Sequence, residues 1–227
     1  MKNILIFGAT GSIGNHLFNS YSNLGYNVYG TTSKNNNEIG KNIYVDINNL
    51  ENLLSIEKLD IIVWAQGYNF NDNIFNFNEE EYFKIMNCNI LFIIKTLNYL
   101  LSNEMVNNDS KMVIISSIWE ELTRDNKLSY SISKSALSGM VKNLSYDLSK
   151  KNILINNVLP GVIDNDMSRN TLKKEQFDYI KNYLFFERLV NVEDIFNTVK
   201  FLTIENTGIT GESIKVDLSF TNIRKYA

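Results

Sequence analysis

Gly8-Ala9-Thr10-Gly11-Ser12-Ile13-Gly14 follows a short apolar run, Lys2 to Gly8, and precedes an amphipathic stretch that starts at Ile13. Glycines in a turn between a strand and a helix permit a tight reversal and a close approach of the backbone to a pyrophosphate, which the first N–H groups of the helix can bind. The stretch therefore predicts a dinucleotide-binding turn after the first strand of a parallel sheet. Another phosphate site, or a merely tight turn, is the alternative when the motif is taken alone.

Apolar, β-branched runs alternate with longer amphipathic stretches along the whole chain, which is the pattern of a parallel sheet covered by helices on both faces. We expect strands at Lys2–Gly8, Asn27–Thr32, Asn42–Val45, Asp60–Ala65, Lys111–Ser116, Leu154–Leu159 and Ser213–Val216. We expect helices near Ile13–Leu24, Asn49–Ile56, Glu79–Asn103, Leu128–Lys150, Thr171–Tyr183 and Val192–Leu202. The sequence thus predicts an α/β Rossmann fold with a doubly wound, seven-stranded parallel sheet, in one domain over residues 1–227.

A second motif, Tyr130-Ser131-Ile132-Ser133-Lys134, lies thirteen residues after Ser117. A tyrosine has an ordinary pKa of about 10, so its use as an acid or base near neutral pH requires a neighbouring cation. On a helix, the spacing of four places Tyr130 and Lys134 on one face, one turn apart. A lone pair of this kind is usually a surface contact, and Ser117 alone could be a hydroxyl that caps a strand end, with Ser116 as a nearby alternative.

The order and spacing of these motifs along the chain resemble the short-chain dehydrogenase/reductase family, in particular its compact branch that includes the 3-oxoacyl-[acyl-carrier-protein] reductases. The resemblance runs almost end to end, and the features that carry it are the glycine turn, Asp46, Asn89, Ser117, Tyr130, Lys134, Pro160-Gly161 and Ile209-Thr210-Gly211-Glu212.

The resemblance implies a role for each catalytic residue. Tyr130 would be the general acid in carbonyl reduction and the base in alcohol oxidation. Lys134 would hold the nicotinamide ribose and lower the pKa of the tyrosine through its charge. Ser117 would hydrogen-bond the same substrate oxygen. Asn89 aligns with the family asparagine that holds a water linking the lysine to solvent, and Asn87 is the nearby alternative.

The resemblance also implies a set of cofactor-binding residues at the ends of the strands. They are Gly8, Thr10, Gly11, Ser12, Ile13, Gly14, Ser33, Lys34, Asp46, Ile47, Ala65, Gln66, Gly67, Tyr130, Lys134, Pro160, Gly161 and Ile163. The run Gly30 to Lys34 contains no acid; Ser33 can hydrogen-bond and Lys34 can offset charge at a ribose 2′-phosphate, which favours NADP(H) over NAD(H). A hydroxyl-rich strand end with a solvated lysine is the alternative.

Three departures from the family pattern concern the detail of the site. Ser12 stands where the compact branch usually has glycine. Trp64-Ala65-Gln66-Gly67 replaces Asn-Asn-Ala-Gly, so the asparagine hydrogen bonds that brace the central strand are expected to be lost. Trp119 and Glu120 stand where small residues are usual, and we expect their bulk and charge to narrow or redirect the substrate site.

Composition limits the compartment and the partners. A formal net charge of −3 and an isoelectric point near 5.3 argue against nucleic acid and anionic membranes as partners, although a small substrate can still be anionic. The single cysteine, Cys88, predicts a buried thiol and a reducing cytoplasm. We see no signal peptide, no apolar run of about 20 residues and no metal cluster, and His16 is the single histidine. The family implies a homo-oligomer, a tetramer or otherwise a dimer.

We therefore expect an NADP-dependent oxidoreductase that reduces a ketone or aldehyde to an alcohol, similar to the 3-oxoacyl-thioester reductases. The altered glycine turn and Trp119-Glu120 leave open a family ketoreductase or dehydrogenase of sugar or surface-polysaccharide biosynthesis. A non-catalytic dinucleotide-binding regulator is the alternative of a different class. The departures at Trp64-Ala65-Gln66 and Asp217-Leu218-Ser219 favour it, whereas the intact Ser-Tyr-Lys set opposes it.

Overall fold

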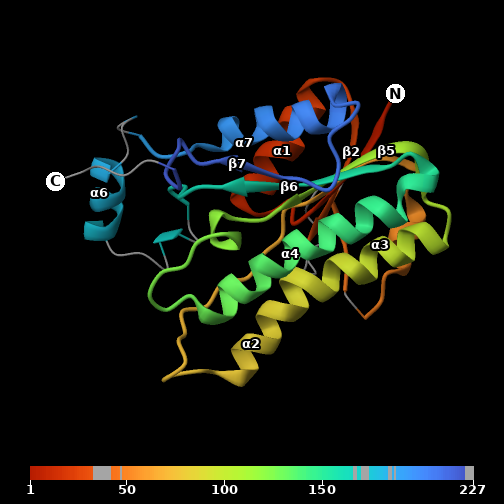
Figure 1. The fold of residues 1–227 in the computed structure, drawn as a ribbon. Helices are drawn as coiled ribbons and strands as arrows, with labels where there is room; N and C mark the ends of the chain where they lie inside the picture. Colours follow the sequence, from red (N-terminus) through yellow and green to blue (C-terminus); the bar gives the residue numbers. More distant parts are fainter. Residues whose placement is uncertain are drawn as a thin grey trace.

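The computed structural model describes residues 1–32, 42–46, 48–165, 168–169, 174–183, 186 and 188–222. These residues form a parallel sheet with the strand order β3-β2-β1-β4-β5-β6-β7 (Figure 1). The strands are β1 (Asn3–Phe7), β2 (Asn27–Thr32), β3 (Asn42–Tyr44), β4 (Leu59–Trp64), β5 (Val106–Ile115), β6 (Leu154–Pro160) and β7 (Ser213–Val216). The strand order reverses between β1 and β4, which confirms the doubly wound fold and places the expected ligand site at their carboxyl ends.

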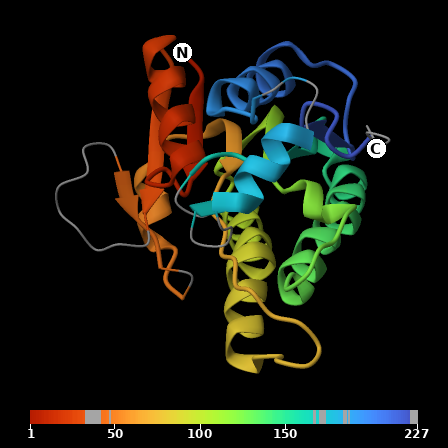
Figure 2. The same ribbon diagram turned by 90° about the vertical axis from the view of Figure 1, so that its left-hand side faces the viewer.

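Helices cover both faces of the sheet. The described helices are α1 (Ser12–Asn23), α2 (Glu79–Met86), α3 (Phe92–Ser102), α4 (Leu128–Asp147), α6 (Lys174–Tyr183) and α7 (Val192–Lys200). Helices α1 and α7 lie on one face, whereas α3 and α4 run side by side on the other (Figure 1). Helix α6 lies beyond the carboxyl ends of the strands, where Ile180 packs with Leu189 and Phe177 (Figures 1 and 2).

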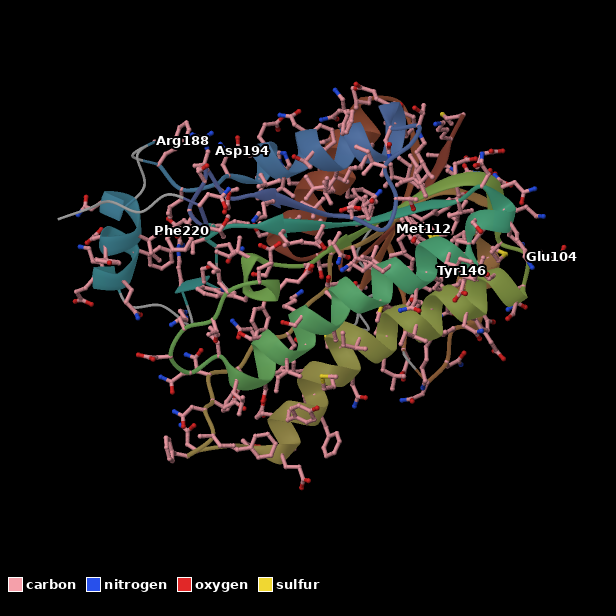
Figure 3. The ribbon with its side chains drawn as sticks, viewed as in Figure 1. Glu104, Met112, Tyr146, Arg188, Asp194 and Phe220 are labelled. Atoms are coloured by element: carbon pink, nitrogen blue, oxygen red, sulfur yellow. The ribbon has the colours of Figure 1, made fainter. Side chains whose placement is uncertain are left out.

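Successive side chains of each central strand pack alternately on the two faces of the sheet. In β1, Leu5 and Phe7 pack in a core with α3 and α4, whereas Ile4 and Ile6 pack in a second core with α1 and α7. Because successive side chains of a strand point to opposite faces, a strand covered on both sides must be apolar at every position. In β5, Met112 (labelled in Figure 3) packs in the first of these cores and Val113 in the second.

Two elements differ from the sequence expectation. Strand β5 begins at Val106 rather than Lys111, because Val106 pairs with Leu59 before an irregularity in the ladder, where Asp109 has a left-handed φ of 63°. Its first half is polar and so lacks the strand pattern. The segment expected as a helix at Asn49–Ile56 is instead a single 3-10 turn, η1 (Glu51–Ser55).

The expected long helix Glu79–Asn103 contains a π-helical turn, η2 (Asn87–Leu91), between α2 and α3. This continuous helix is long and apolar enough to cross a membrane by length and composition, with a mean hydropathy of 1.3 in its most apolar window. Such a test is also passed by core helices, and here Ile93, Leu97 and Leu100 pack against the sheet. The expectation of no apolar run of this length did not include it, because Asn87 and Asn89 interrupt the apolar residues of the helix.

Gly14→Ala should destabilise the fold. A Cβ at Gly14 would lie 2.2 Å from the carbonyl oxygen of Gly8, which is backbone and cannot move aside cheaply. We expect the free energy of unfolding, measured with urea, to fall by about 1–3 kcal/mol or more. Gly208→Ala is the matched control, because nothing lies within 4 Å of its added Cβ and its stability should change by less than about 1 kcal/mol. Equal stability of Gly14→Ala and wild type would contradict the packing described here.

Candidate active site

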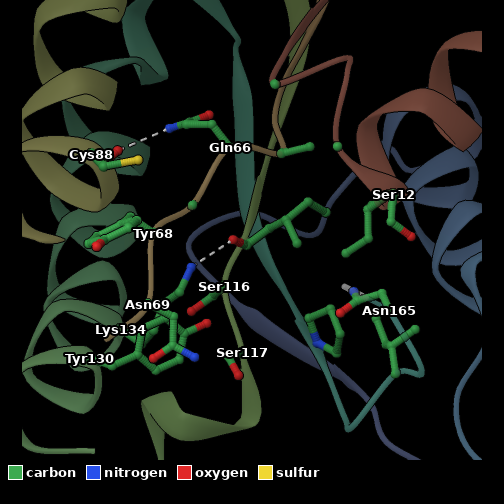
Figure 4. Close-up of a pocket in the computed structure, with 18 of the residues that line it drawn as sticks. Ser12, Gln66, Tyr68, Asn69, Cys88, Ser116, Ser117, Tyr130, Lys134 and Asn165 are labelled. Carbon is green, nitrogen blue, oxygen red and sulfur yellow. Dashed lines mark hydrogen bonds between the residues drawn. The ribbon is translucent and has the colours of Figure 1, made fainter. Parts of the chain in front are cut away.

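A pocket of about 970 Å³ opens at the carboxyl ends of the central strands. It is lined by the glycine turn, by the ends of β4 and β5, by the start of α4 and by the loop after β6. In Figure 4, Ser12 and Asn165 lie on one side of this pocket and Tyr68, Asn69 and Tyr130 on the other. The two motifs found in the sequence therefore meet in one cavity.

The glycines of the turn have separate physical roles. Gly8 has a left-handed φ of 75°, and a Cβ there would lie 2.7 Å from the backbone nitrogen of Gln66. Gly14 allows α1 to approach Gly8 and does not itself line the pocket. A Cβ at Gly11 would meet its nearest neighbour at an ordinary 3.5 Å, so packing alone does not require glycine at this position.

The turn has the properties of an anion-binding site. Gly11 is the N-cap of α1, makes no side-chain cap hydrogen bond, and is followed by no acid in the first turn. The first N–H groups of the helix thus have no side-chain acceptor at the cap, which is the arrangement that binds phosphate at helix N-termini. Among the described residues, the buried Oε1 of Gln66 also has no hydrogen-bond partner. Both observations fit a dinucleotide bound across the strand ends.

Most of the expected cofactor residues lie together around this pocket. Those that line it are Gly8, Thr10, Gly11, Ser12, Ile13, Asp46, Ala65, Gln66, Gly67, Tyr130, Lys134, Pro160, Gly161 and Ile163. Ser33, Lys34 and Ile47 lie outside the described residues.

The catalytic candidates converge on the other side of the pocket. Tyr130 and Lys134 are both buried on α4, and the Nζ of Lys134 lies 5.6 Å from the centre of the Tyr130 ring. Lys134 donates a hydrogen bond of 3.1 Å to the carbonyl oxygen of Ile115, at the end of β5 (Figure 4). Ser117, two residues further along, hydrogen-bonds the phenol of Tyr130.

Burial controls the protonation of this set. It raises the pKa of the Tyr130 phenol to about 12, an effect that the hydrogen bond with Ser117 opposes. It lowers the pKa of the Lys134 ammonium to about 8, against the opposing influence of Cys88 and Glu120. The net pKa of Tyr130 is therefore raised and not lowered in this structure, because removal from water disfavours the phenolate more strongly than the neighbouring groups stabilise it. At neutral pH the phenol holds its proton.

The side chain of Asn89 connects two parts of the site by hydrogen bonds. Its side chain is buried, accepts a hydrogen bond of 2.8 Å from the backbone nitrogen of Tyr68, and donates to the carbonyl oxygen of Tyr68 and the hydroxyl of Ser133, each at 3.0 Å. It does not line the pocket, whereas Asn87 does. Asn89 thereby ties the loop after β4 to α4.

Trp64 and Glu120 depart from the family pattern, and both side chains are buried with hydrogen-bond partners. Trp64 donates from Nε1 to the hydroxyl of Thr96 at 2.9 Å and stacks on Phe7. Glu120 is buried and accepts hydrogen bonds from the hydroxyls of Ser116 and Ser213, so it joins the end of β5 to β7. The expectation that Glu120 would charge the mouth of the site is wrong, because its side chain does not line the pocket. Trp119 does line it.

Lys127 is a charged residue of the site that sequence reasoning missed. It lines the pocket with only 1% of its surface exposed, and its Nζ lies 5.3 Å from the centre of the Tyr130 ring. Burial, followed by the charge of Arg124, lowers the pKa of its ammonium to about 7. Its position three residues before Tyr130, one turn away at the helix start, was the available signal.

A profile of the family described as Enoyl-(Acyl carrier protein) reductase matches residues 49–221. The 3-oxoacyl-[acyl-carrier-protein] reductase FabG of Rickettsia felis is 30% identical, and the alignment covers 95% of each chain. The chain belongs to the short-chain dehydrogenase/reductase family. It is thus an NAD(P)-dependent oxidoreductase of that family.

Solved structures of short-chain dehydrogenase/reductases have the same fold. A short-chain dehydrogenase family protein from Francisella tularensis superposes with a TM-score of 0.85 at 22% identity, covering 97% of this chain and 99% of its own. A structure described as ElxO with NADP bound has a TM-score of 0.84 at 22% identity, covering 98% and 99%.

Lys127→Met should change how the stability of this short-chain dehydrogenase/reductase depends on pH. The folded protein releases the Lys127 proton near pH 7, whereas the unfolded chain keeps it to about pH 10.4. Between these values the unfolded state binds more protons, so this residue makes the wild type more stable as pH rises. From pH 7 to about 9, urea unfolding should show the wild type gaining about 2 kcal/mol relative to the variant. If the difference in unfolding free energy between wild type and variant does not change with pH, then Lys127 does not lose its proton near pH 7 in the folded protein.

Proposed function

We propose that this protein is an NADP-dependent reductase that converts a ketone or aldehyde to an alcohol. The observation that carries the proposal is the meeting of Ser117, Tyr130 and Lys134 in the same pocket as the glycine turn. A proton donor and a pyrophosphate-binding turn at two sides of one cavity are what a dinucleotide-dependent carbonyl reduction requires.

In this proposal, Tyr130 gives its proton to the carbonyl oxygen, and Ser117 donates a hydrogen bond to the same oxygen while negative charge develops there. NADPH, when bound, supplies the hydride that reaches the carbonyl carbon. The C=O π bond is lost, and one C–H and one O–H bond are formed. The high pKa of Tyr130 suits the acid role, because the phenol enters the reaction protonated.

Lys134 stabilises Tyr130 after the phenol has given its proton to the substrate. The phenolate would be a buried anion, and the nearby ammonium offsets part of the cost of its burial. Its anchor on the carbonyl oxygen of Ile115 holds the ammonium at the end of β5. We assign Lys134 this role together with that of binding the nicotinamide ribose.

The preference for NADP(H) rests on charge at the end of β2. Thr31 and Thr32 line the pocket there, and neither carries the carboxylate that would repel a 2′-phosphate. Lys34, which follows in the sequence, offers an opposite charge. The similarity to a structure with bound NADP supports the same choice.

For the substrate we propose a 3-oxoacyl compound, supported by the similarity to FabG over nearly the whole chain. A keto-sugar is the second candidate, because Trp119 and Ser12 line the pocket where relatives of the compact branch usually have smaller residues. The two candidate substrates can be distinguished by measuring which carbonyl compounds cause the protein to oxidise NADPH.

Tyr130→Phe should lower turnover by about 10²–10⁴-fold, because the general acid is lost while the ring that fills the site is kept. Absorbance of NADPH and NADH, with 3-oxoacyl thioesters, keto-sugars and small ketones, measures both the substrate class and the cofactor preference. We expect turnover with NADPH to exceed that with NADH. NADPH binding without turnover of any carbonyl compound would favour the regulator, and an active Tyr130→Phe variant would refute the assigned acid.

We also propose that the protein is a homo-oligomer, a tetramer or otherwise a dimer. Apolar side chains are exposed on the outer sides of the helices that pair along one face, at Phe83, Leu91, Ile94 and Ile132. In Figure 3, Tyr146 on α4 also points outward, and it is 81% exposed. A second copy of the same face would remove these groups from water.

Light scattering after gel filtration should give at least twice the chain mass of 26.2 kDa. Ile94→Asp should shift the protein toward the monomer, because a carboxylate would be buried at the contact. Leu54→Asp, which places the same charge at an exposed leucine of η1, should not. A wild-type mass of one chain at all concentrations would refute the proposal.

A further inference from the structure

The ammonium of Lys127 is buried without an ion pair among the described residues. It donates hydrogen bonds of 2.8 and 2.9 Å to the amide oxygens of Asn69 and Asn71, which are neutral. An ammonium has three donors, so two amides leave one unused. Buried charges in proteins are normally paired, because an isolated one is costly. The missing partner can come from whatever occupies the pocket that Lys127 lines.

The charges around Lys127 do not supply that partner. Asp72, the carboxylate whose charge acts on Lys127, is fully buried and accepts hydrogen bonds from the backbone nitrogen and the hydroxyl of Ser129 at the start of α4. Arg124 lines the same pocket, and its charge has a larger effect on Lys127 than that of Asp72. Two cations therefore adjoin one end of the cavity.

The other charged side chains that line the pocket differ from Lys127 in position or in their partners. Asp46 is the single carboxylate among its described lining residues, and it lies after β3, beside the glycine turn. Lys84 also lines the pocket, but it is already paired with Glu80 at 2.7 Å and Glu81 at 2.9 Å. Lys134 donates a hydrogen bond to the carbonyl oxygen of Ile115 and lies beside the ring of Tyr130. Among the described cations of the pocket, Lys127 is therefore the buried one whose hydrogen-bond partners are neutral, and Arg124, which lies over the Trp119 ring, adds its charge at the same end.

We propose that the substrate carries an oxyanion close to its carbonyl group, and that Lys127 together with Arg124 binds it. This rests on the proposed carbonyl reductase function and, within it, selects free 3-oxo acids or phosphorylated ketones over neutral 3-oxoacyl thioesters. Lys127 lies over the ring whose hydroxyl donates its proton to the carbonyl oxygen, so the anion and the carbonyl are separated by no more than a few bonds. A long neutral acyl chain would leave the ammonium without its partner.

Binding to the Tyr130→Phe protein with NADPH at about pH 6, where Lys127 is protonated, tests this inference without any need for turnover. We would compare, by calorimetry, acetoacetate with methyl acetoacetate, and dihydroxyacetone phosphate with dihydroxyacetone. In at least one pair the anion should bind about tenfold or more tightly than its neutral partner, because a hydrogen bond to a charged group is worth this much. The pair that shows the preference distinguishes a carboxylate from a phosphate.

Lys127→Gln, added to Tyr130→Phe, should reduce that preference to about threefold or less, since the amide keeps polarity but not charge. Lys84→Gln is the matched control, because it removes a pocket lysine that is already ion-paired, and the preference should persist. Thermal melting shows whether Lys127→Gln folds. If it does not, Arg124→Gln provides the same test from the loop before α4, with a reduced preference expected.

Equal binding of the charged and neutral members in both pairs, or a preference that survives the loss of Lys127, would overturn the oxyanion site. Turnover of neutral ketones in that case would leave the proposed function standing. Conversely, a strong anion preference with no oxidation of NADPH by the protein that retains Tyr130 would keep the site and overturn the reductase.

Discussion

The contact between the glycine turn and the loop after β4 is the constraint on which the rest of the site depends. Gly8 lies so close to Gln66 that no side chain fits between them, and Gly14 brings α1 against Gly8 itself. These contacts align the helix N-terminus with the carboxyl ends of β1 and β4. The helix that carries Tyr130 and Lys134 is then held against the other side of the same opening by β5 and Asn89.

Buried polar groups hold the site in place where the sequence lacks the usual residues. Asn89 braces the loop after β4, Trp64 couples β4 to α3, and Glu120 fixes the end of β5 to β7. Each group has hydrogen-bond partners, as the high cost of an unsatisfied buried polar group demands. Lys127 differs because its hydrogen-bond acceptors, the amides of Asn69 and Asn71, are neutral, which leaves its charge for an anionic ligand.

Sequence reasoning predicted the elements whose signal is local. The strands β1 and β4 were visible because both faces are buried, and the Tyr130-Lys134 spacing was visible because a helix turn brings the two together. The first half of β5 was missed because its residues are polar and its pairing depends on β4. Lys127 and Glu120 were missed or misassigned because burial of a charged side chain is decided by tertiary packing, which a single sequence does not display.

Transfer of a label from the dinucleotide to the product tests the central claim most directly. NADPH that carries deuterium at the transferred position would be incubated with acetoacetate or methyl acetoacetate, and the alcohol analysed by mass spectrometry. The account predicts one deuterium on the carbinol carbon of each product molecule. Alcohol without that deuterium, or no alcohol from any carbonyl compound despite bound NADPH, would contradict it.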